Sequence, residues 1–92
     1  MTATVTEPVV APRLSKKFRL QWEDAQHAWV LLYPEGMVKL NQSAGEILSR
    51  CNGERTLTEL VADLEQTFDT TGLHADVVAF LRMARQQLWI EY

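Results

Sequence analysis

The fold predicted for this chain rests first on the stretch WVLLYPEGMVKLN, residues 29–41. Its first five residues are apolar on both faces of a strand, a pattern typical of the central strand of a sheet. The PEG that follows, residues 34–36, predicts a three-residue hairpin turn, because Pro presets φ at the first turn position and Gly36 tolerates the positive φ that closes the turn. The next four residues, MVKL, return antiparallel and leave an unpaired outer edge.

A half-buried strand is predicted before this hairpin. Residues 17–23 alternate strictly between polar and apolar, so that Phe18, Leu20 and Trp22 share one face. The polar run DAQHA separates this strand from the hairpin. We therefore expect a three-stranded antiparallel sheet with residues 29–33 in the middle and a free edge on each outer strand.

Three amphipathic helices are predicted after the sheet. The first begins at Asn41 or Ser43, and Ser43 with Glu46 has the spacing of a capping box. Thr56 begins the second helix with the same spacing, and the third covers about residues 75–89. The side chains expected on the inner faces recur at helical spacing: Ala44, Ile47, Leu48 and Cys51; Leu57, Leu60, Val61, Leu64 and Phe68; Val77, Phe80, Leu81, Ala84 and Leu88. The tail WIEY either extends the third helix or turns back as an edge strand.

Length and composition indicate how many domains the chain forms and whether it enters a membrane. The chain has 92 residues, enough for one domain. We expect residues 1–12 to be a mobile arm without periodicity, and residues 13–92 to form the folded domain. The arm lacks the basic start and apolar run of a signal peptide, and no stretch approaches the roughly 20 apolar residues of a membrane helix. A cytoplasmic protein without a membrane partner is therefore expected.

Catalytic and metal chemistry are not predicted. Cys51 is the only cysteine and ends an apolar helical stripe, so we interpret it as a core residue. His27 and His74 fall near expected turns and lack metal-ligand spacing with Cys51. Trp22 and Trp29 follow core-facing periodicity, which favours packing over the stacking of bases. The chain is therefore predicted to be no enzyme and to carry no cofactor or metal.

Charge argues against a nucleic-acid partner. The chain has 9 basic and 12 acidic residues and a formal net charge of −3, whereas DNA binding relies on clustered Lys and Arg that neutralise phosphates. A winged-helix DNA-binding regulator stays an alternative, because the third helix carries Arg82 and Arg85 among polar neighbours.

The free edge formed by residues 37–40 leads to two hypotheses. In the first it is a protected edge without a function, because it is short and carries a lysine. In the second it is a site of β-augmentation, at which an extended peptide pairs as a further strand. If one flank of the third helix borders this strand, the two form a groove. Its apolar floor and basic rim would be formed by Val78, Leu81, Arg82 and Arg85.

Several segments within residues 12–88 carry a resemblance to a known family: RLQWEDA, VLLYPEGMVKLN, SAGEIL, CNGERTLTELV and DVVAFL. In this order they resemble the PqqD family, peptide chaperones of pyrroloquinoline quinone (PQQ) biosynthesis of the kind called RiPP recognition elements. The resemblance implies an α+β, winged-helix-turn-helix-like fold with a three-stranded antiparallel sheet followed by three helices. The chain departs from the family in QQLWIEY, because many relatives have a Gly after the third helix.

The resemblance also implies a function. Members of the family bind the ribosomally made precursor peptide PqqA as an added strand on the third strand, beside the third helix. They present it to PqqE, a radical S-adenosylmethionine enzyme that joins a Glu and a Tyr side chain within the peptide. Carried onto this sequence, the peptide-binding residues are Met37, Val38, Lys39, Leu40, Val78, Leu81, Arg82 and Arg85. An exposed sheet edge also permits pairing of two copies, so a homodimer stays open.

Overall fold

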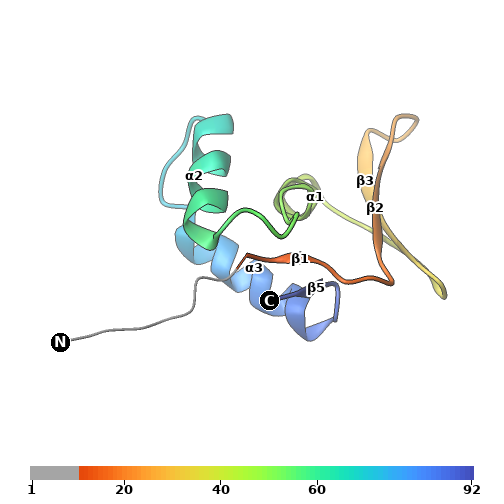
Figure 1. The fold of residues 1–92 in the computed structure, drawn as a ribbon. Coiled ribbons are helices and arrows are strands. Elements are labelled where there is room, and N and C mark those ends of the chain that lie inside the picture. The colour runs from red at the N-terminus through yellow and green to blue at the C-terminus, as the bar shows by residue number, and fades with distance from the viewer. Residues whose placement is uncertain (1–10) are drawn as a thin grey trace.

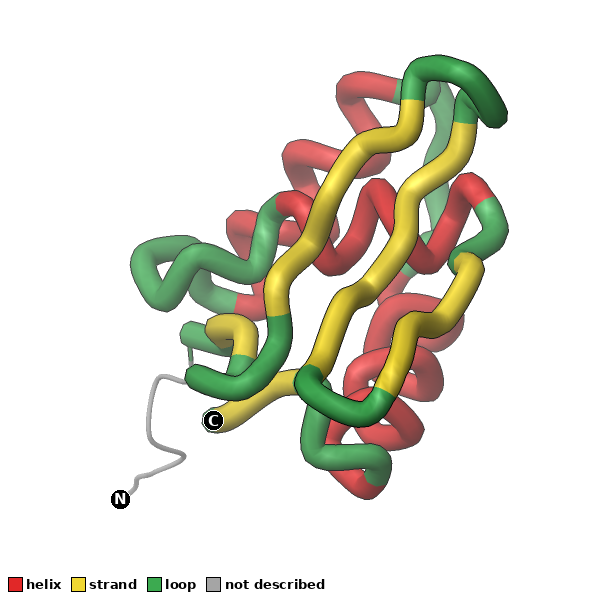
Figure 2. Tube along the Cα trace, turned by 90° about the vertical axis from the view of Figure 1, so that its right-hand side faces the viewer, coloured by secondary structure: helices red, strands yellow, loops and turns green. Residues whose placement is uncertain are grey.

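A computed structural model describes residues 11–92. Its main sheet has the order β2 (Arg19–Glu23), β3 (Ala28–Tyr33) and β4 (Gly36–Lys39), and both pairs are antiparallel. Leu31 in β3 lies opposite Leu20 and Val38, so that inward-facing residues of the three strands share one face. Figure 2 shows the sheet in front of the helices, which cover one of its two faces. The predicted three-stranded antiparallel sheet is confirmed.

The β3–β4 turn is shorter than predicted. Tyr33 pairs directly with Gly36, so that only Pro34 and Glu35 connect the two strands. Gly36 belongs to β4 and is not one of the residues with positive φ. The prediction of a three-residue turn closed by Gly36 is therefore wrong, because the strand pairing continues one residue further toward the turn.

A second, two-stranded sheet ties the two ends of the described chain together. β1 (Arg13–Leu14) pairs antiparallel with β5 (Ile90–Glu91), and the Ser15 N–H donates to the Trp89 carbonyl oxygen at 2.9 Å. Figure 1 shows this pair beside α3. Of the two alternatives for the tail WIEY, the edge strand is therefore correct. β1 was not predicted, because two residues carry no readable periodicity.

The predicted mobile arm, residues 1–12, falls mainly on residues 1–10, which lie outside the described residues. Its last residue, Pro12, is fully buried, and its carbonyl oxygen accepts a hydrogen bond from the Gly53 N–H at 3.0 Å. The folded part therefore includes Pro12 and begins before Arg13.

Three helices follow the main sheet: α1 (Gln42–Ser49), α2 (Leu57–Thr67) and α3 (His74–Gln86). The Asn41 side chain caps α1 by accepting the Ala44 N–H at 2.7 Å. Ser43, the other candidate cap, lies inside α1, and Glu46 pairs with Arg50 instead, so the predicted Ser43–Glu46 capping box is wrong. Within residues 11–92, no helix is both long and apolar enough to cross a membrane.

α2 follows its prediction at the start and departs from it at the end. Thr56 Oγ1 accepts the Glu59 N–H at 3.2 Å, and Glu59 Oε1 accepts the Thr56 N–H at 2.9 Å, which is the predicted capping box. Phe68 was predicted on the inner face, but it lies just past the helix and is 42% exposed. The helix ends one residue too early to keep Phe68 on its buried stripe.

α3 ends at Gln86 rather than near residue 89. Leu88 has a φ of +66°, and this left-handed conformation turns the chain back toward β1. The predicted inward position of Leu88 is therefore wrong: its side chain is 71% exposed. The rest of the predicted stripe packs in or against the core: Val77, Phe80, Leu81 and Ala84.

α1 packs closely on the sheet because of Gly45. Figure 1 shows α1 between the main sheet and α2. Gly45 faces the Trp29 ring of β3, and a Cβ at this position would overlap the ring atoms. Leu31 of the sheet and Leu48 of α1 are 0% and 1% exposed. The hydrophobic core therefore lies between the inner face of the sheet and the helices.

Candidate functional site

The outer edge of β4 is unpaired within residues 11–92, because β4 is the last strand in the order β2-β3-β4. Leu40 donates its N–H inward to the Trp29 carbonyl oxygen at 3.0 Å. Backbone groups alternate in direction along an antiparallel strand, so Met37 and Lys39 direct their N–H and C=O groups outward. These are the donors and acceptors with which an added strand pairs.

A groove of about 350 Å³ runs between this edge, α1 and α3. Val38 lines it from β4, Leu40 from just after β4, Ile47 from α1, and Phe80 and Met83 from α3. Apolar side chains therefore lie directly beside a free strand edge. Such an arrangement can pair with the main chain of an extended peptide and receive alternate side chains of that peptide.

The structure brings three of the four predicted strand residues to this groove. Val38, Lys39 and Leu40 all line it. Met37 points to the outer face of the sheet and is 57% exposed. The backbone of Met37 still belongs to the free edge, so its contribution there does not depend on its side chain.

The four helix residues predicted for the site are Val78, Leu81, Arg82 and Arg85. Leu81 is 3% exposed and belongs to the hydrophobic core. At about 100° per residue, the other three fall on the flank of α3 opposite to Phe80 and Met83. The Arg85 guanidinium lies over the Tyr92 ring there, 4.6 Å from the ring centroid. The structure therefore does not bring this predicted set to the groove.

On α3, the groove residues that sequence reasoning did not place in the site are Asp76, Phe80 and Met83. They too follow helical spacing, along the other flank of the buried stripe. A helical pattern identifies the stripe and its two flanks, but it does not tell which flank borders β4. The only sequence signal for the correct flank was Met83, an apolar residue three positions after Phe80.

The charged groups of the groove are of both signs. Lys39 and Asp76 line it, and neither forms an ion pair within the described part of the chain. Asp76 lies in the first turn of α3, where the helix dipole stabilises a carboxylate. The groove therefore offers a free cation and a free anion to a ligand, rather than the basic rim that we predicted.

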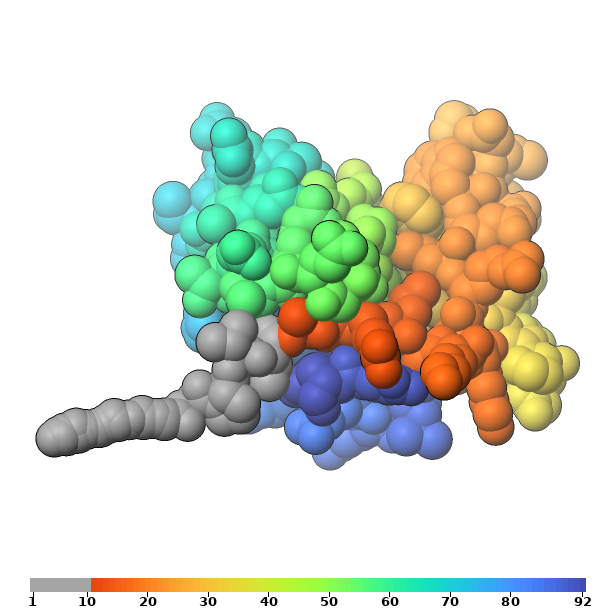
Figure 3. All heavy atoms as spheres, in the orientation of Figure 1, coloured from red at the N-terminus to blue at the C-terminus, as the bar shows by residue number. Residues whose placement is uncertain are grey.

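A second hollow lies between α1 and the tip of the β2–β3 hairpin (Figure 3). Trp22 and Trp29 line it with their rings edge to face, 5.3 Å between centroids. Trp22 is 43% exposed, so the prediction that it packs in the core is wrong, whereas Trp29 packs against the core. Trp22 therefore contacts Trp29 but leaves much of its own ring open to solvent.

Cys51 is a core residue, as predicted. It is 5% exposed, and its thiol donates to the Ile47 carbonyl oxygen at 3.3 Å. Burial raises the pKa of the Cys51 thiol to about 12, so the thiol is protonated near neutral pH. Because the thiolate is the nucleophilic form, Cys51 is unsuited to covalent catalysis.

Sequence comparisons relate the chain to proteins of known role. The family model described as coenzyme PQQ synthesis protein D (PqqD) matches residues 28–90. A PqqA binding protein of Azotobacter vinelandii is 51% identical over 81 residues, which cover 87% of this chain and 88% of that protein. A PqqA binding protein of Pseudomonas aeruginosa is 52% identical over 81 residues, which again cover 87% of this chain and 88% of that protein.

A solved structure has the same fold. It is the solution NMR structure of the PqqD truncation of Methylobacterium extorquens PqqCD, described as a functional, stand-alone RiPP recognition element. The two superpose with a TM-score of 0.74 at 29% identity, over 90% of this chain and 89% of the other. The predicted α+β, winged-helix-turn-helix-like fold class is confirmed.

Proposed function

The chain belongs to the PqqD family, and from this premise we propose that it binds the precursor peptide PqqA as an added strand on β4. The observation that carries the proposal is the free backbone edge at Met37 and Lys39, directly beside an apolar groove. The names of the relatives support the identity of the peptide, because those proteins are PqqA binding proteins.

Binding draws on both the edge and the groove. Each backbone hydrogen bond contributes about 0.5–1.5 kcal/mol net, and ordering a flexible peptide costs at least about 2–5 kcal/mol. Apolar side chains of the peptide must therefore add roughly 1.5–3 kcal/mol each by burial. The surface on which they are buried is formed by Val38 of β4, the adjoining Leu40, and Phe80 and Met83 of α3.

The proposed role is that of an adaptor rather than of an enzyme. A peptide held through its backbone on one edge keeps the side chains of its outer face accessible to another protein. We place PqqE, the radical S-adenosylmethionine enzyme, as the recipient of this peptide. A pull-down of PqqE with the chain, with and without the peptide, tests this part separately.

The decisive experiment replaces Lys39 by Pro. Proline removes the outward N–H, and its ring occupies the edge where a strand would pair, while the inward bond from Leu40 to Trp29 stays. We expect Lys39→Pro to keep its fold and to bind the PqqA peptide at least about tenfold more weakly, a loss of roughly 1.4 kcal/mol. Isothermal titration calorimetry measures the affinity, and the amide NMR spectrum reports the fold.

Lys39→Ala is the matched control. It removes the side chain and its charge but keeps the backbone N–H, so its affinity is expected to stay within a few-fold of wild type. If Lys39→Pro folds and binds as well as wild type, strand addition at β4 is wrong.

Two other hypotheses, a DNA-binding regulator and a domain that pairs with a second copy of itself, gain no support from the structure. The arginines of α3 that a DNA-binding regulator would use include Arg85, whose guanidinium lies over Tyr92. Self-pairing of the β4 edge stays a prediction. Light scattering across a dilution series tests it, and a dimer that dissociates on peptide addition would place both partners on the same edge.

A further inference from the structure

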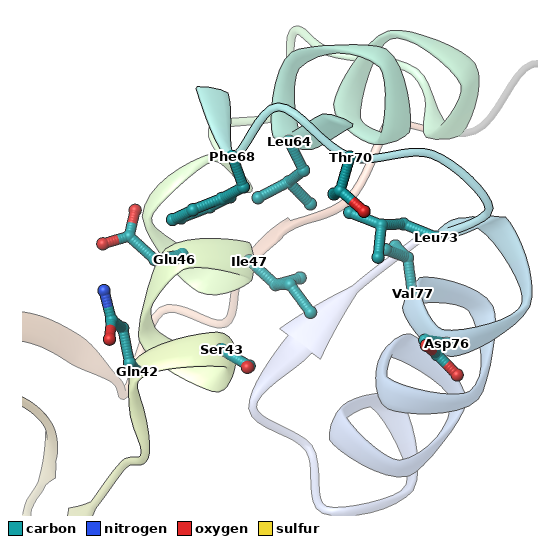
Figure 4. A pocket seen from close by; sticks show the side chains of 10 residues that line it. All are labelled: Gln42, Ser43, Glu46, Ile47, Leu64, Phe68, Thr70, Leu73, Asp76 and Val77. Carbon is teal, nitrogen blue, oxygen red and sulfur yellow. The ribbon is translucent and has the colours of Figure 1, made fainter. Parts of the chain in front are cut away.

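A second pocket, of about 330 Å³, opens where the three helices meet. Figure 4 shows apolar side chains from all three helical regions around it, with Leu64 and Phe68 on one side and Leu73 and Val77 on another. Phe68 is 42% exposed at the rim. An aromatic ring at the mouth of an apolar pocket can cover a large side chain that enters from solvent.

This pocket adjoins the β4 groove. Both are lined by Ser43, Ile47 and Asp76. From Asn41, where β4 leads into α1, to Ile47 the helix rises about 9 Å, a distance that about three extended residues span. A strand added to β4 that continues past Lys39 therefore reaches the pocket within a few residues.

The walls of the pocket are held in place by Arg50. Its Nε donates to Asp63 of α2 at 2.5 Å, and its Nη1 donates to Glu46 of α1 at 2.9 Å. Burial alone would lower the pKa of Arg50, but hydrogen bonds and charge from Glu46 and Asp63 raise it above its usual value. The loop before α3 is also fixed, because Glu65 Oε2 accepts the Leu73 N–H at 3.0 Å. The pocket is thus formed before any ligand arrives.

In the described part of the chain, the ion pair between Arg50 and Glu46 leaves one unpaired carboxylate where the pocket meets the β4 groove. Glu46 lines the pocket, but its carboxylate pairs with Arg50. Asp76 lines both the pocket and the groove and has no ion-pair partner within residues 11–92. An exposed carboxylate between an apolar pocket and a strand edge complements a basic side chain.

We propose that the peptide paired with β4 continues into this pocket and anchors there a large apolar side chain, with a neighbouring Lys or Arg at Asp76. The proposal rests on the proposed function, since it extends the same bound peptide. The sheet is antiparallel throughout, and antiparallel addition places the anchoring residues before the paired segment. The occupant is thus the peptide region immediately N-terminal to the paired strand.

The test uses two peptides and two substitutions. Amide NMR with the full-length PqqA peptide first locates the segment that pairs with β4. A second peptide then begins at that segment and lacks everything before it. Phe68→Ala removes the ring at the rim, and Thr70→Trp fills the pocket from an exposed lining position.

We expect each substitution to weaken binding of the full-length peptide by about tenfold, and binding of the shortened peptide by less than about twofold. Asp76→Asn is expected to weaken the full-length peptide by about threefold at low salt, with a smaller effect at high salt. Leu88→Ala is the control, because Leu88 is an exposed apolar residue that lines neither the groove nor the pocket. It should leave both affinities unchanged.

The outcomes separate the two proposals. If neither peptide binds the wild-type chain, the proposed function fails. If both peptides bind the wild type equally well, and if Phe68→Ala and Thr70→Trp leave the full-length affinity unchanged, the second anchor is wrong while strand addition stands. If Phe68→Ala does not fold, Thr70→Trp alone decides the matter, since Thr70 is exposed and its replacement removes nothing from the core.

Discussion

The two flanks of α3 meet different surroundings. One carries Phe80 and Met83 and borders the groove beside β4. The other carries Arg82 and Arg85, and Arg85 lies over the ring of Tyr92 at the end of the chain. In the sequence both flanks accompany the same buried stripe, and the basic flank is the more conspicuous one. A conspicuous run of charge on a helix therefore does not identify the flank that borders the strand edge, which here is the apolar flank.

The largest expected effect concerns α1, the wall of the groove opposite to α3. Gly45→Ala places a Cβ within the Trp29 ring, so α1 must move away from the sheet. We expect the free energy of unfolding to fall by about 1–3 kcal/mol and the melting temperature to fall by roughly 4–20 °C. Thermal and urea unfolding measure both quantities.

Ser49→Ala is the matched control for this change, because Ser49 lies on the exposed side of α1. It should alter stability by less than about 0.5 kcal/mol. A Gly45→Ala variant as stable as wild type would mean that the contact with Trp29 does not determine the position of α1, and hence not the width of the groove.

Two adjacent residues of α3 test the comparison of flanks directly. Met83→Asp puts a charge into the groove and removes an apolar contact, so we expect the PqqA peptide to bind at least about tenfold more weakly, or roughly 1.4 kcal/mol. Arg82→Asp alters the opposite flank and is expected to change the affinity by less than about twofold. Calorimetric titration of both variants provides the comparison.

The reverse result is informative as well. A large loss for Arg82→Asp with none for Met83→Asp would return the site to the flank predicted from the sequence. Both variants change exposed side chains, so a loss of fold is not expected to obscure the outcome.

The smallest effect concerns the end of α3, where Leu88 turns the chain back toward β1. Leu88 has a φ of +66°, so its backbone is strained. Its side chain is 71% exposed and therefore gains little from burial. We expect Leu88→Gly to raise the free energy of unfolding by about 0.5–1 kcal/mol, because Gly adopts this conformation without the Cβ clash. Thermal unfolding would show a rise of a few degrees.

Leu88→Ala keeps the Cβ and hence the strain, and should give no such gain. A drop in stability with Leu88→Gly would contradict the interpretation and would indicate that the Leu88 side chain packs in a contact important for folding.

Several features of the fold were predictable because their causes are local. The alternation of residues 17–23 and the apolar run of residues 29–33 predicted the sheet and its central strand. The capping box at Thr56 and Glu59 predicted where α2 begins. Each of these depends on side chains a few residues apart, which is the range over which periodicity and capping act.

Other features depended on distant partners and were missed or wrong. β1 exists because residues 90–91 return to pair with it, and Gly45 matters because Trp29 approaches from another strand. Leu88 follows helical spacing but leaves the helix, since the left-handed turn there carries the chain to β1. The predicted capping box of Ser43 and Glu46 does not form, because Asn41 caps α1 and Arg50 binds Glu46.

The sequence alone predicted the three strands of the main sheet, the three helices and the strand with the free edge, and it carried the resemblance to the family. The tertiary structure alone decided which flank of α3 borders that edge and that a second pocket adjoins the groove. The physical reason is that spacing along a helix specifies which residues share a face, whereas the neighbour of that face is set by how the helices pack on the sheet.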